Sequence, residues 1–245
     1  MVWIIPIIIF ATSFVSGILG MAGGMVLIGV LSLTFSIANA MILHGITQIG
    51  ANGFRAFLLR RHIQFKVLLP YILGAGLGFL LFSAINFIPS KSTVLIAVGI
   101  FPFVSLLMPK SIPIDILKRK NAFICGISII TLQLLAGASG PILDVFFVKS
   151  SLNRHQIIAT KAITQTLGHL IKLLYYSQIL FFSIEESLEV PYLLFPVAIA
   201  CAFLGTTGGK LVLDKLSEFQ FQKYSKIAIA LIGGLYILKG LILSF

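Results

Sequence analysis

The stretch GILGMAGGMVLIGVL, residues 17–31, places a cluster of glycines inside an apolar run that extends from Val2 to Phe35. A second apolar run, residues 122–148, is broken in the same way by GASGP at residues 137–141. Glycines let the backbone turn, and irregular backbone at membrane depth is tolerated only where it is buried or lines a cavity. The two clusters therefore predict two broken membrane helices around which the rest of the chain is organised.

The composition favours an integral membrane protein. Of the 245 residues, 58% are hydrophobic and only 10% are charged, whereas soluble domains carry about 25% charged residues. One membrane crossing needs about 20 apolar residues, and long apolar runs account for most of the chain. The runs cover residues 2–35, 45–59, 67–88, 93–108, 122–148, 157–182, 190–213 and 227–243. They predict an all-α polytopic membrane protein with about eight membrane segments.

The two halves of the chain form an internal repeat. The triplet Ile-Thr-Gln at residues 46–48 recurs at residues 163–165, an offset of 117, and the glycine breaks coincide in the same register. Further pairs align at this offset or at 131, namely Asn52 with His169, Arg55 with Lys172, Gly74 with Gly205 and Gly78 with Gly209. We therefore expect one integral transport domain built from two repeats, residues 1–117 and 118–245, each a glycine-broken helix followed by three transmembrane helices.

The positive charges distinguish two topologies. The chain has 18 Lys and Arg against 7 Asp and Glu, and cytoplasmic loops are enriched in Lys and Arg. Eight simple crossings with parallel halves would divide the loop cations seven against six. If each broken segment enters and leaves on one side, twelve cations share a side and two lie opposite. The twelve are Arg60, Arg61, Lys66, Lys110, Lys118, Arg119, Lys120, Lys149, Arg154, Lys215, Lys223 and Lys226; the two are Lys91 and Lys239.

The second topology is favoured, and it makes the two repeats inverted. Each broken segment is then a re-entrant hairpin or two short crossings, the basic loops are cytoplasmic, and both termini lie outside. The expected partners are the lipid bilayer and a small anionic substrate, not nucleic acid. Cys125 and Cys201 lie far apart in apolar runs and show no metal-ligand spacing. No grouping typical of a hydrolytic enzyme occurs, and no cofactor is expected.

The breaks and their neighbours indicate where an anion would bind. Half-helices beginning near Gly24 and Pro141 would point free N–H groups and positive dipole ends inward, which favours anions. Arg55 and Lys172 occupy the same repeat position, so an inverted twofold could bring both to one site, although Arg55 could instead extend to the interface. The candidate substrate-binding residues are Gly23, Gly24, Thr47, Gln48, Asn52, Arg55, Gly140, Thr164, Gln165, His169 and Lys172.

Two residues are candidates for proton coupling. His169 can titrate near neutral pH, and Asp144 is the one acidic residue within an apolar run. Asp144 could alternatively pair with a lysine or cap a half-helix. His44 is expected at the membrane interface.

Several motifs resemble the TauE/SafE sulfite exporter family of bacterial membrane transporters. They are the broken segment at residues 17–31, HGITQIGANGFRAFLLRR at residues 44–61, GAGLG at residues 74–78 and GTTGG at residues 205–209, together with the duplicated halves. The resemblance covers essentially the whole chain. It implies a secondary transporter of sulfite, thiosulfate or an organosulfonate such as sulfoacetate, often proton-coupled, in the bacterial inner membrane. Met21 and Ala22, which interrupt the glycines, depart from the longer glycine run of many members.

Other functional classes remain as alternatives. They are an anion channel, a cation carrier, and a membrane sensor or assembly protein that transports nothing. Sparse acidic residues inside the apolar runs argue against cation selectivity. The sequence leaves open the transported anion, the direction of transport and the oligomeric state, with a homodimer among the alternatives.

Overall fold

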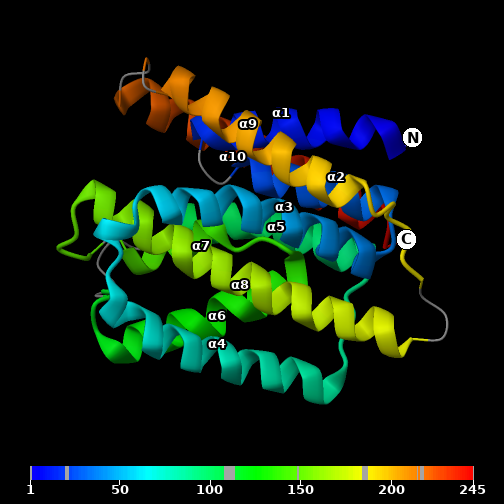
Figure 1. Ribbon diagram of the computed structural model, residues 1–245, viewed down its shortest axis with the longest axis horizontal. Coiled ribbons are helices and arrows are strands. Elements are labelled where there is room, and N and C mark those ends of the chain that lie inside the picture. Colours follow the sequence, from blue (N-terminus) through cyan, green and yellow to red (C-terminus); the bar gives the residue numbers. More distant parts are fainter. Residues whose placement is uncertain are drawn as a thin grey trace.

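The computed structural model describes residues 2–19, 22–107, 114–147, 149–183, 187–213, 215 and 218–244. Within these residues the chain forms ten α-helices and two short 3-10 helices, with no strand (Figure 1). In chain order they are η1 (Val2–Ile4), α1 (Ile5–Leu19), α2 (Ala22–Thr34), α3 (Ile37–Leu58), η2 (Arg60–His62), α4 (Phe65–Ile85), α5 (Lys91–Leu107), α6 (Arg119–Ala136), α7 (Gly140–Phe147), α8 (Arg154–Phe182), α9 (Leu194–Leu213) and α10 (Glu218–Ile242). The expected all-helical architecture is confirmed for this part of the chain.

Both glycine-broken segments fold back on themselves. In the first, α2 returns along α1, and Gly23 packs so closely that a Cβ there would overlap the Thr12 carbonyl oxygen (Figure 1). In the second, α7 returns towards the start of α6, because the Ile116 N–H donates to the Phe146 carbonyl oxygen at 2.9 Å. The chain therefore enters and leaves each broken segment at the same end of the bundle. Gly20 and Met21, at the first break, lie outside the described residues.

The closest helix pairs join the two halves of the chain. The most extensive contacts are those of α1 with α9, α4 with α6, α3 with α8, and α5 with α10. The predicted sequence repeat would equate α1 with α6, α3 with α8, α4 with α9, and α5 with α10. When each helix is replaced by its repeat counterpart, the α1–α9 pair becomes the α6–α4 pair. The α3–α8 pair and the α5–α10 pair each stay the same pair, because their two helices are counterparts of each other.

Glycines bring the paired helices into backbone contact. A Cβ on Gly74 of α4 would overlap the Phe123 carbonyl oxygen of α6, and a Cβ on Gly205 of α9 would overlap the Phe10 carbonyl oxygen of α1. These two glycines are the residues that the sequence repeat aligns. Small residues at helix contacts are typical of membrane bundles, where close packing and not the hydrophobic effect drives association.

The outer surface of the bundle is strongly apolar. On α4 a row of large side chains is exposed, comprising Leu69, Ile72, Leu73, Leu77, Leu80, Leu81 and Ile85. A soluble monomer rarely exposes such a contiguous patch, whereas a lipid-facing helix requires one. By length and composition two helices, Phe65–Ile85 and Leu194–Val212, qualify individually as membrane spans. The other helices are shorter, carry charge or are less apolar, so a membrane location rests on the whole bundle.

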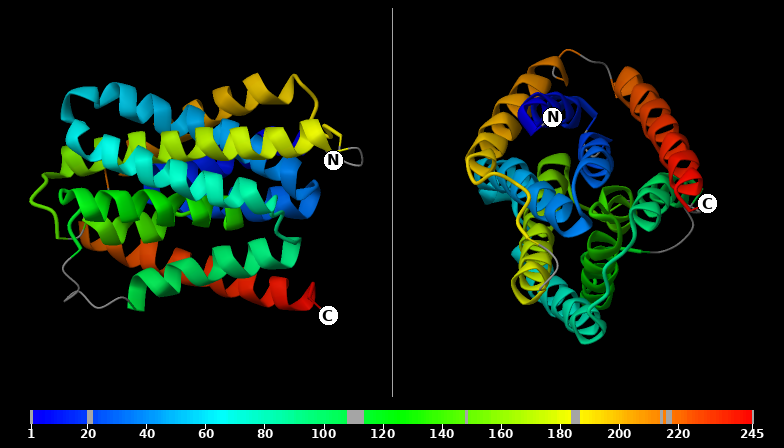
Figure 2. Two further views of the ribbon diagram at one scale, coloured as in Figure 1. Left: turned by 90° about the horizontal axis from the view of Figure 1, so that it is seen from below. Right: turned by 90° about the vertical axis from the view of Figure 1, so that its right-hand side faces the viewer.

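The loops divide between two ends of the bundle. At one end, the Gln64 N–H donates to Thr160 Oγ1 at 3.0 Å, and the rings of His62 and His155 lie 5.3 Å apart. These contacts join the basic loop after α3 to the start of α8. The loop before α6 and the end of α7 lie at the same end (Figure 2). The end therefore carries most of the loop cations in the described chain.

The opposite end carries both termini (Figure 2). There Asn39 Nδ2 donates to the Ser187 carbonyl oxygen at 2.9 Å, and the Glu189 N–H donates to Asn39 Oδ1 at 3.0 Å. Glu189 Oε2 accepts the Ser36 N–H at 3.1 Å. This arrangement ties the loop between α8 and α9 to the start of α3 in the other half of the chain.

The glycine contacts lead to a stability prediction. Gly74→Ala forces its new methyl group against the Phe123 carbonyl, and overpacking of this kind costs roughly 1–3 kcal/mol. Gly76 of the same helix has open space around its Cβ position. Gly76→Ala is therefore the matched control, and it should be neutral or stabilising by about 0.5–1 kcal/mol. Thermal unfolding in detergent measures both, and a Gly74→Ala protein as stable as the wild type would contradict the packing described.

Candidate functional site

A lysine is completely buried in the centre of the bundle. Lys172 lies midway along α8, and its side chain has 0% exposure to solvent. Its Nζ contacts His44 Nδ1 on α3 at 2.8 Å and donates to the Gly137 carbonyl oxygen at 3.0 Å. Fully buried lysines are rare unless they are paired, so these contacts mark the centre of a site.

The contacts of His44 fix its hydrogen positions. His44 Nε2 lies 3.0 Å from the Gly24 carbonyl oxygen, which can only accept a hydrogen bond. Nε2 therefore carries the hydrogen, and in a neutral ring Nδ1 accepts from Lys172. A continuous chain of hydrogen bonds thus joins Gly24, His44, Lys172 and Gly137, and it connects the two broken segments. His44, which was expected at the membrane interface, lies inside the bundle and is 1% exposed.

The second break explains why a cation is held here. Gly137 ends α6 with φ of +77°, a left-handed conformation that glycine adopts without strain. The turn leaves the carbonyls of the last turn of α6 without helical partners. Tyr176 donates to the Leu134 carbonyl oxygen, and Lys172 donates to that of Gly137. The lysine therefore also interacts favourably with the negative end of the α6 dipole.

Three further polar side chains around this centre lack partners. Gln133, one turn before Gly137, is fully buried, and neither its Oε1 nor its Nε2 makes a hydrogen bond. Ser139 Oγ and His169 Nδ1 are also buried without partners. The His169 ring lies edge-on to that of His44, with centroids 5.5 Å apart. Unpaired buried polar atoms each cost about 1–3 kcal/mol, so their concentration beside Lys172 is consistent with a ligand site.

The site has no acidic residue among its described contacts. The ion pair found within the described residues joins Lys161 to Asp144, whose side chains are 22% and 38% exposed. Of the roles considered for Asp144, the structure shows the pairing with a lysine. Lys172, in contrast, has no carboxylate partner among the described residues, and its third N–H is unpaired. The arrangement offers hydrogen-bond donors and one amine that carries a positive charge when it is protonated.

The predicted stripe on α3 forms a hydrogen-bonded ladder. Asn52 Nδ2 donates to Gln48 Oε1 at 3.3 Å, and Arg55 Nη1 reaches Asn52 Oδ1 at 3.5 Å. Gln48 lies beside Gly24 at the first break. Arg55 is eleven residues beyond His44, or about 16 Å along the helix axis, in the last turn of α3. Arg55 and Lys172 are thus not brought into contact.

The two threonines that the repeat aligns have structural contacts. Thr47 Oγ1 donates to the Leu43 carbonyl oxygen at 2.7 Å, and Thr164 Oγ1 donates to that of Thr160 at 3.0 Å. Both hydroxyls are buried and bonded within their own helices. Because each hydroxyl hydrogen is already donated to a carbonyl of its own helix, neither threonine has a donor left for a ligand.

The remaining predicted residues fall into two groups. Gly24 and Gly140 are buried at the two breaks, and the carbonyl of Gly24 takes part in the hydrogen-bond chain. Gly23 packs α2 against α1, and Gln165 is half-buried on α8. Sequence reasoning missed His44 as a central residue and did not consider the side chains of Gln133 or Ser139 as ligand contacts. A glutamine one turn before a glycine break, inside an apolar run, was the available signal for Gln133.

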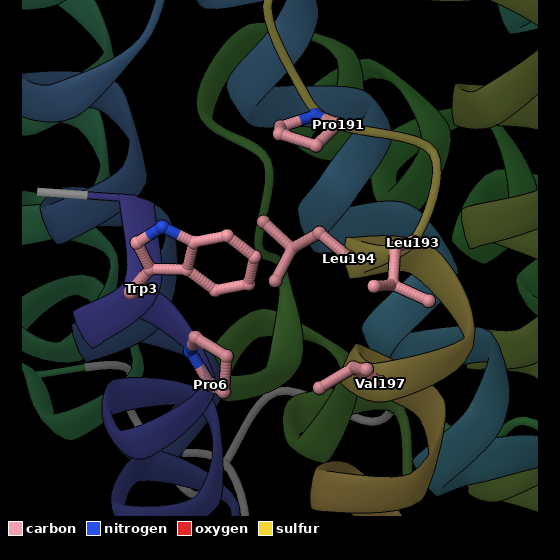
Figure 3. Close-up of a pocket in the computed structure, with 6 residues that line it drawn as sticks. All are labelled: Trp3, Pro6, Pro191, Leu193, Leu194 and Val197. Carbon is pink, nitrogen blue, oxygen red and sulfur yellow. The ribbon is translucent and has the colours of Figure 1, made fainter.

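An apolar pocket elsewhere on the molecule is a poor match for an anion. It lies between the N-terminal segment and the start of α9 (Figure 3). Its lining contains no charged side chain and consists of Trp3, Pro6, Pro191, Leu193, Leu194 and Val197. The central polar cluster is therefore the candidate site.

The helical bundle with an apolar surface and a buried polar centre defines a class of membrane transport proteins. The chain belongs to the sulfite exporter TauE/SafE family, whose model matches residues 5–236. The predicted resemblance is confirmed over nearly the whole chain, and the family is one of multi-pass membrane transporters of sulfur-containing anions. Comparison with curated proteins and with solved structures gives no match.

Proposed function

We propose that this protein is a secondary transporter of small sulfur-containing anions, such as sulfite, thiosulfate or sulfoacetate, held beside Lys172 between the two broken helices. The observation that carries the proposal is a completely buried lysine with no carboxylate partner among its described contacts. Ionisable residues inside membrane bundles are costly and mark transport pathways. An anion at Lys172 supplies the missing opposite charge, and charge-assisted hydrogen bonds are about twice as strong as neutral ones.

The remaining donors are supplied by the same region. The half-helices α2 and α7 begin at the two breaks, with Gly24 and Gly140 in their first turns. Backbone N–H groups at such helix starts favour anions. His169, whose Nδ1 is unpaired, faces the His44 ring. The proposed binding set is therefore Lys172 and His169 with the backbone of Gly24 and Gly140.

The proposed topology consists of two inverted repeats, residues 1–117 and 118–245, each a re-entrant hairpin followed by three crossings. The exchange of helix pairs under the repeat and the doubling back of both broken segments support this arrangement. The basic end faces the cytoplasm of a bacterial cell, and the termini face outward. His62→Cys and Ile88→Cys, in a background without Cys125 and Cys201, should react with an impermeant thiol reagent from opposite sides. Reaction from one side only would contradict this topology.

The central prediction concerns the charge of Lys172. Lys172→Met keeps the length and apolar stem of the side chain but removes the cation. We expect sulfite flux into liposomes to fall by at least about 10- to 100-fold, because one charge-assisted hydrogen bond contributes roughly 1.5–3 kcal/mol. Lys239→Met is the control, since Lys239 is an exposed lysine near the end of α10.

Folding must be assessed in the same experiment, since Lys172 also caps α6. Monodisperse size-exclusion profiles and thermal unfolding of the detergent-solubilised variant report whether the bundle is intact. A folded Lys172→Met protein with wild-type sulfite flux would refute the proposed site.

We assign proton coupling to His169. It is buried with an unpaired ring nitrogen, whereas Asp144, the other candidate, is bonded to Lys161. His169→Gln retains hydrogen-bonding capacity but cannot take up a proton near neutral pH. We expect its sulfite flux to lose its response to a pH gradient, while Asp144→Asn keeps that response. The reverse pattern would move the coupling to Asp144, and flux that never responds to a pH gradient would exclude coupling.

A further inference from the structure

The side chain of Gln133 is an unused polar group in the middle of the site. It is fully buried on α6, and both its amide nitrogen and its amide oxygen lack hydrogen-bond partners. A glutamine amide has two donor hydrogens and an acceptor oxygen. Burying all of them unpaired is costly, and an apolar residue of similar volume would fill the same space without that cost.

The neighbouring helix makes room for this amide. Gly168 of α8 faces Gln133, and a Cβ there would overlap Gln133 Oε1. The next residue along α8 is His169, and Lys172 follows one turn later. On α6, the residue one turn after Gln133 is Gly137, whose carbonyl accepts from Lys172. The amide therefore lies one turn from the Lys172–Gly137 contact on both helices.

The site offers both hydrogen-bond donors and a hydrogen-bond acceptor. Lys172 has one unpaired N–H, and Gln133 Nε2 and Ser139 Oγ can also donate to oxygen atoms of an anion. Gln133 Oε1, in contrast, can only accept. A fully deprotonated oxyanion offers only acceptors and would leave this oxygen unpaired. An anion that keeps an O–H group would satisfy it.

The charge of the site restricts the ligand further. With Lys172 protonated and His169 unprotonated, the site carries one positive charge, and the contacts of His44 are those of a neutral ring. A singly charged anion balances this charge, whereas a dianion would leave a net negative charge in a low-dielectric interior. The hydrogen bonds therefore favour an anion with an O–H group, and the charge favours an anion with a single negative charge.

We propose that Gln133, in the space left by Gly168, is a specificity-determining residue that selects a singly charged oxyanion carrying an O–H group. Among small sulfur oxyanions, hydrogensulfite has this chemistry near neutral pH, whereas sulfate, thiosulfate and methanesulfonate have no O–H. The inference rests on the proposed transport function and specifies the form of the substrate. A site built to bond a substrate hydroxyl discriminates strongly against analogues that lack it.

The test compares three anions in liposomes containing the full-length protein, with protein-free liposomes as the blank. Methanesulfonate has the charge of hydrogensulfite but no O–H, and sulfate has two charges. We expect wild-type flux of hydrogensulfite, measured at mildly acidic pH, to exceed that of each of the other two at least about tenfold. Wild-type flux of methanesulfonate or sulfate equal to that of hydrogensulfite would overturn the proposal.

Substitutions at and beside Gln133 then test whether this residue sets the preference. Gln133→Leu should lower hydrogensulfite flux about 10- to 100-fold and methanesulfonate flux by less, because methanesulfonate loses the bond from Nε2 but never made the bond to Oε1. Gln178→Leu, at an exposed position of α8, is the matched control and should retain the wild-type ratio of hydrogensulfite flux to methanesulfonate flux. If Gln133→Leu fails to fold, Gly168→Ala displaces the amide and should reduce the ratio in the same direction. An unchanged ratio in a folded variant would overturn the role of Gln133.

The outcomes separate this inference from the transport function itself. A wild-type protein that moves none of the three anions, nor thiosulfate or sulfoacetate, would defeat the proposed function. A protein whose flux requires Lys172 but whose anion preference is independent of Gln133 would defeat only the assignment of specificity.

Discussion

The structure depends on placing one ammonium group where two helices break. A broken helix leaves backbone carbonyls and N–H groups at membrane depth, where no water is available to pair them. Lys172 resolves part of this problem, because it donates to the Gly137 carbonyl and to His44, which in turn donates to the Gly24 carbonyl. The same solution leaves a buried amine whose protonated form has no carboxylate among its described contacts. The instability of that charge is what an anionic substrate would relieve.

The two repeats that the sequence predicts do not contribute equally to the centre. At an offset of 117, the position of Lys172 corresponds to Arg55, and that of His44 corresponds to Lys161. The counterpart of the Lys172–His44 contact would therefore join two cations, which cannot bond to each other. Lys161 instead pairs with Asp144. Of these four aligned residues, Lys172 is thus the one amine at the centre, and it has no carboxylate partner among its described contacts.

The sequence predicted the large-scale features because they follow from composition and periodic pattern. Apolar runs, aligned glycines and the basic loops indicated the helices and both breaks, and the repeat identified Lys172 and His169. The site was harder to predict because contact partners depend on how helices cross. Gly45 of α3 lies next to Lys172, Gly53 lies next to Thr166, and Gln64, just after α3, bonds to Thr160. Because the numbers rise along one helix as they fall along the other, α3 and α8 run antiparallel. Equivalent positions such as Arg55 and Lys172 therefore lie at different depths, and His44 becomes the partner of Lys172.

The bound anion can be located in a crystal structure of the protein with selenite, an electron-rich analogue of sulfite whose selenium scatters anomalously. We expect an anomalous peak beside Lys172, with an oxygen of the anion within hydrogen-bond distance of Nζ and the selenium between Gly24 and Gly140. The peak should disappear in the Lys172→Met protein. A peak confined to the basic end near Arg55, or one at the centre that persists without Lys172, would contradict the account.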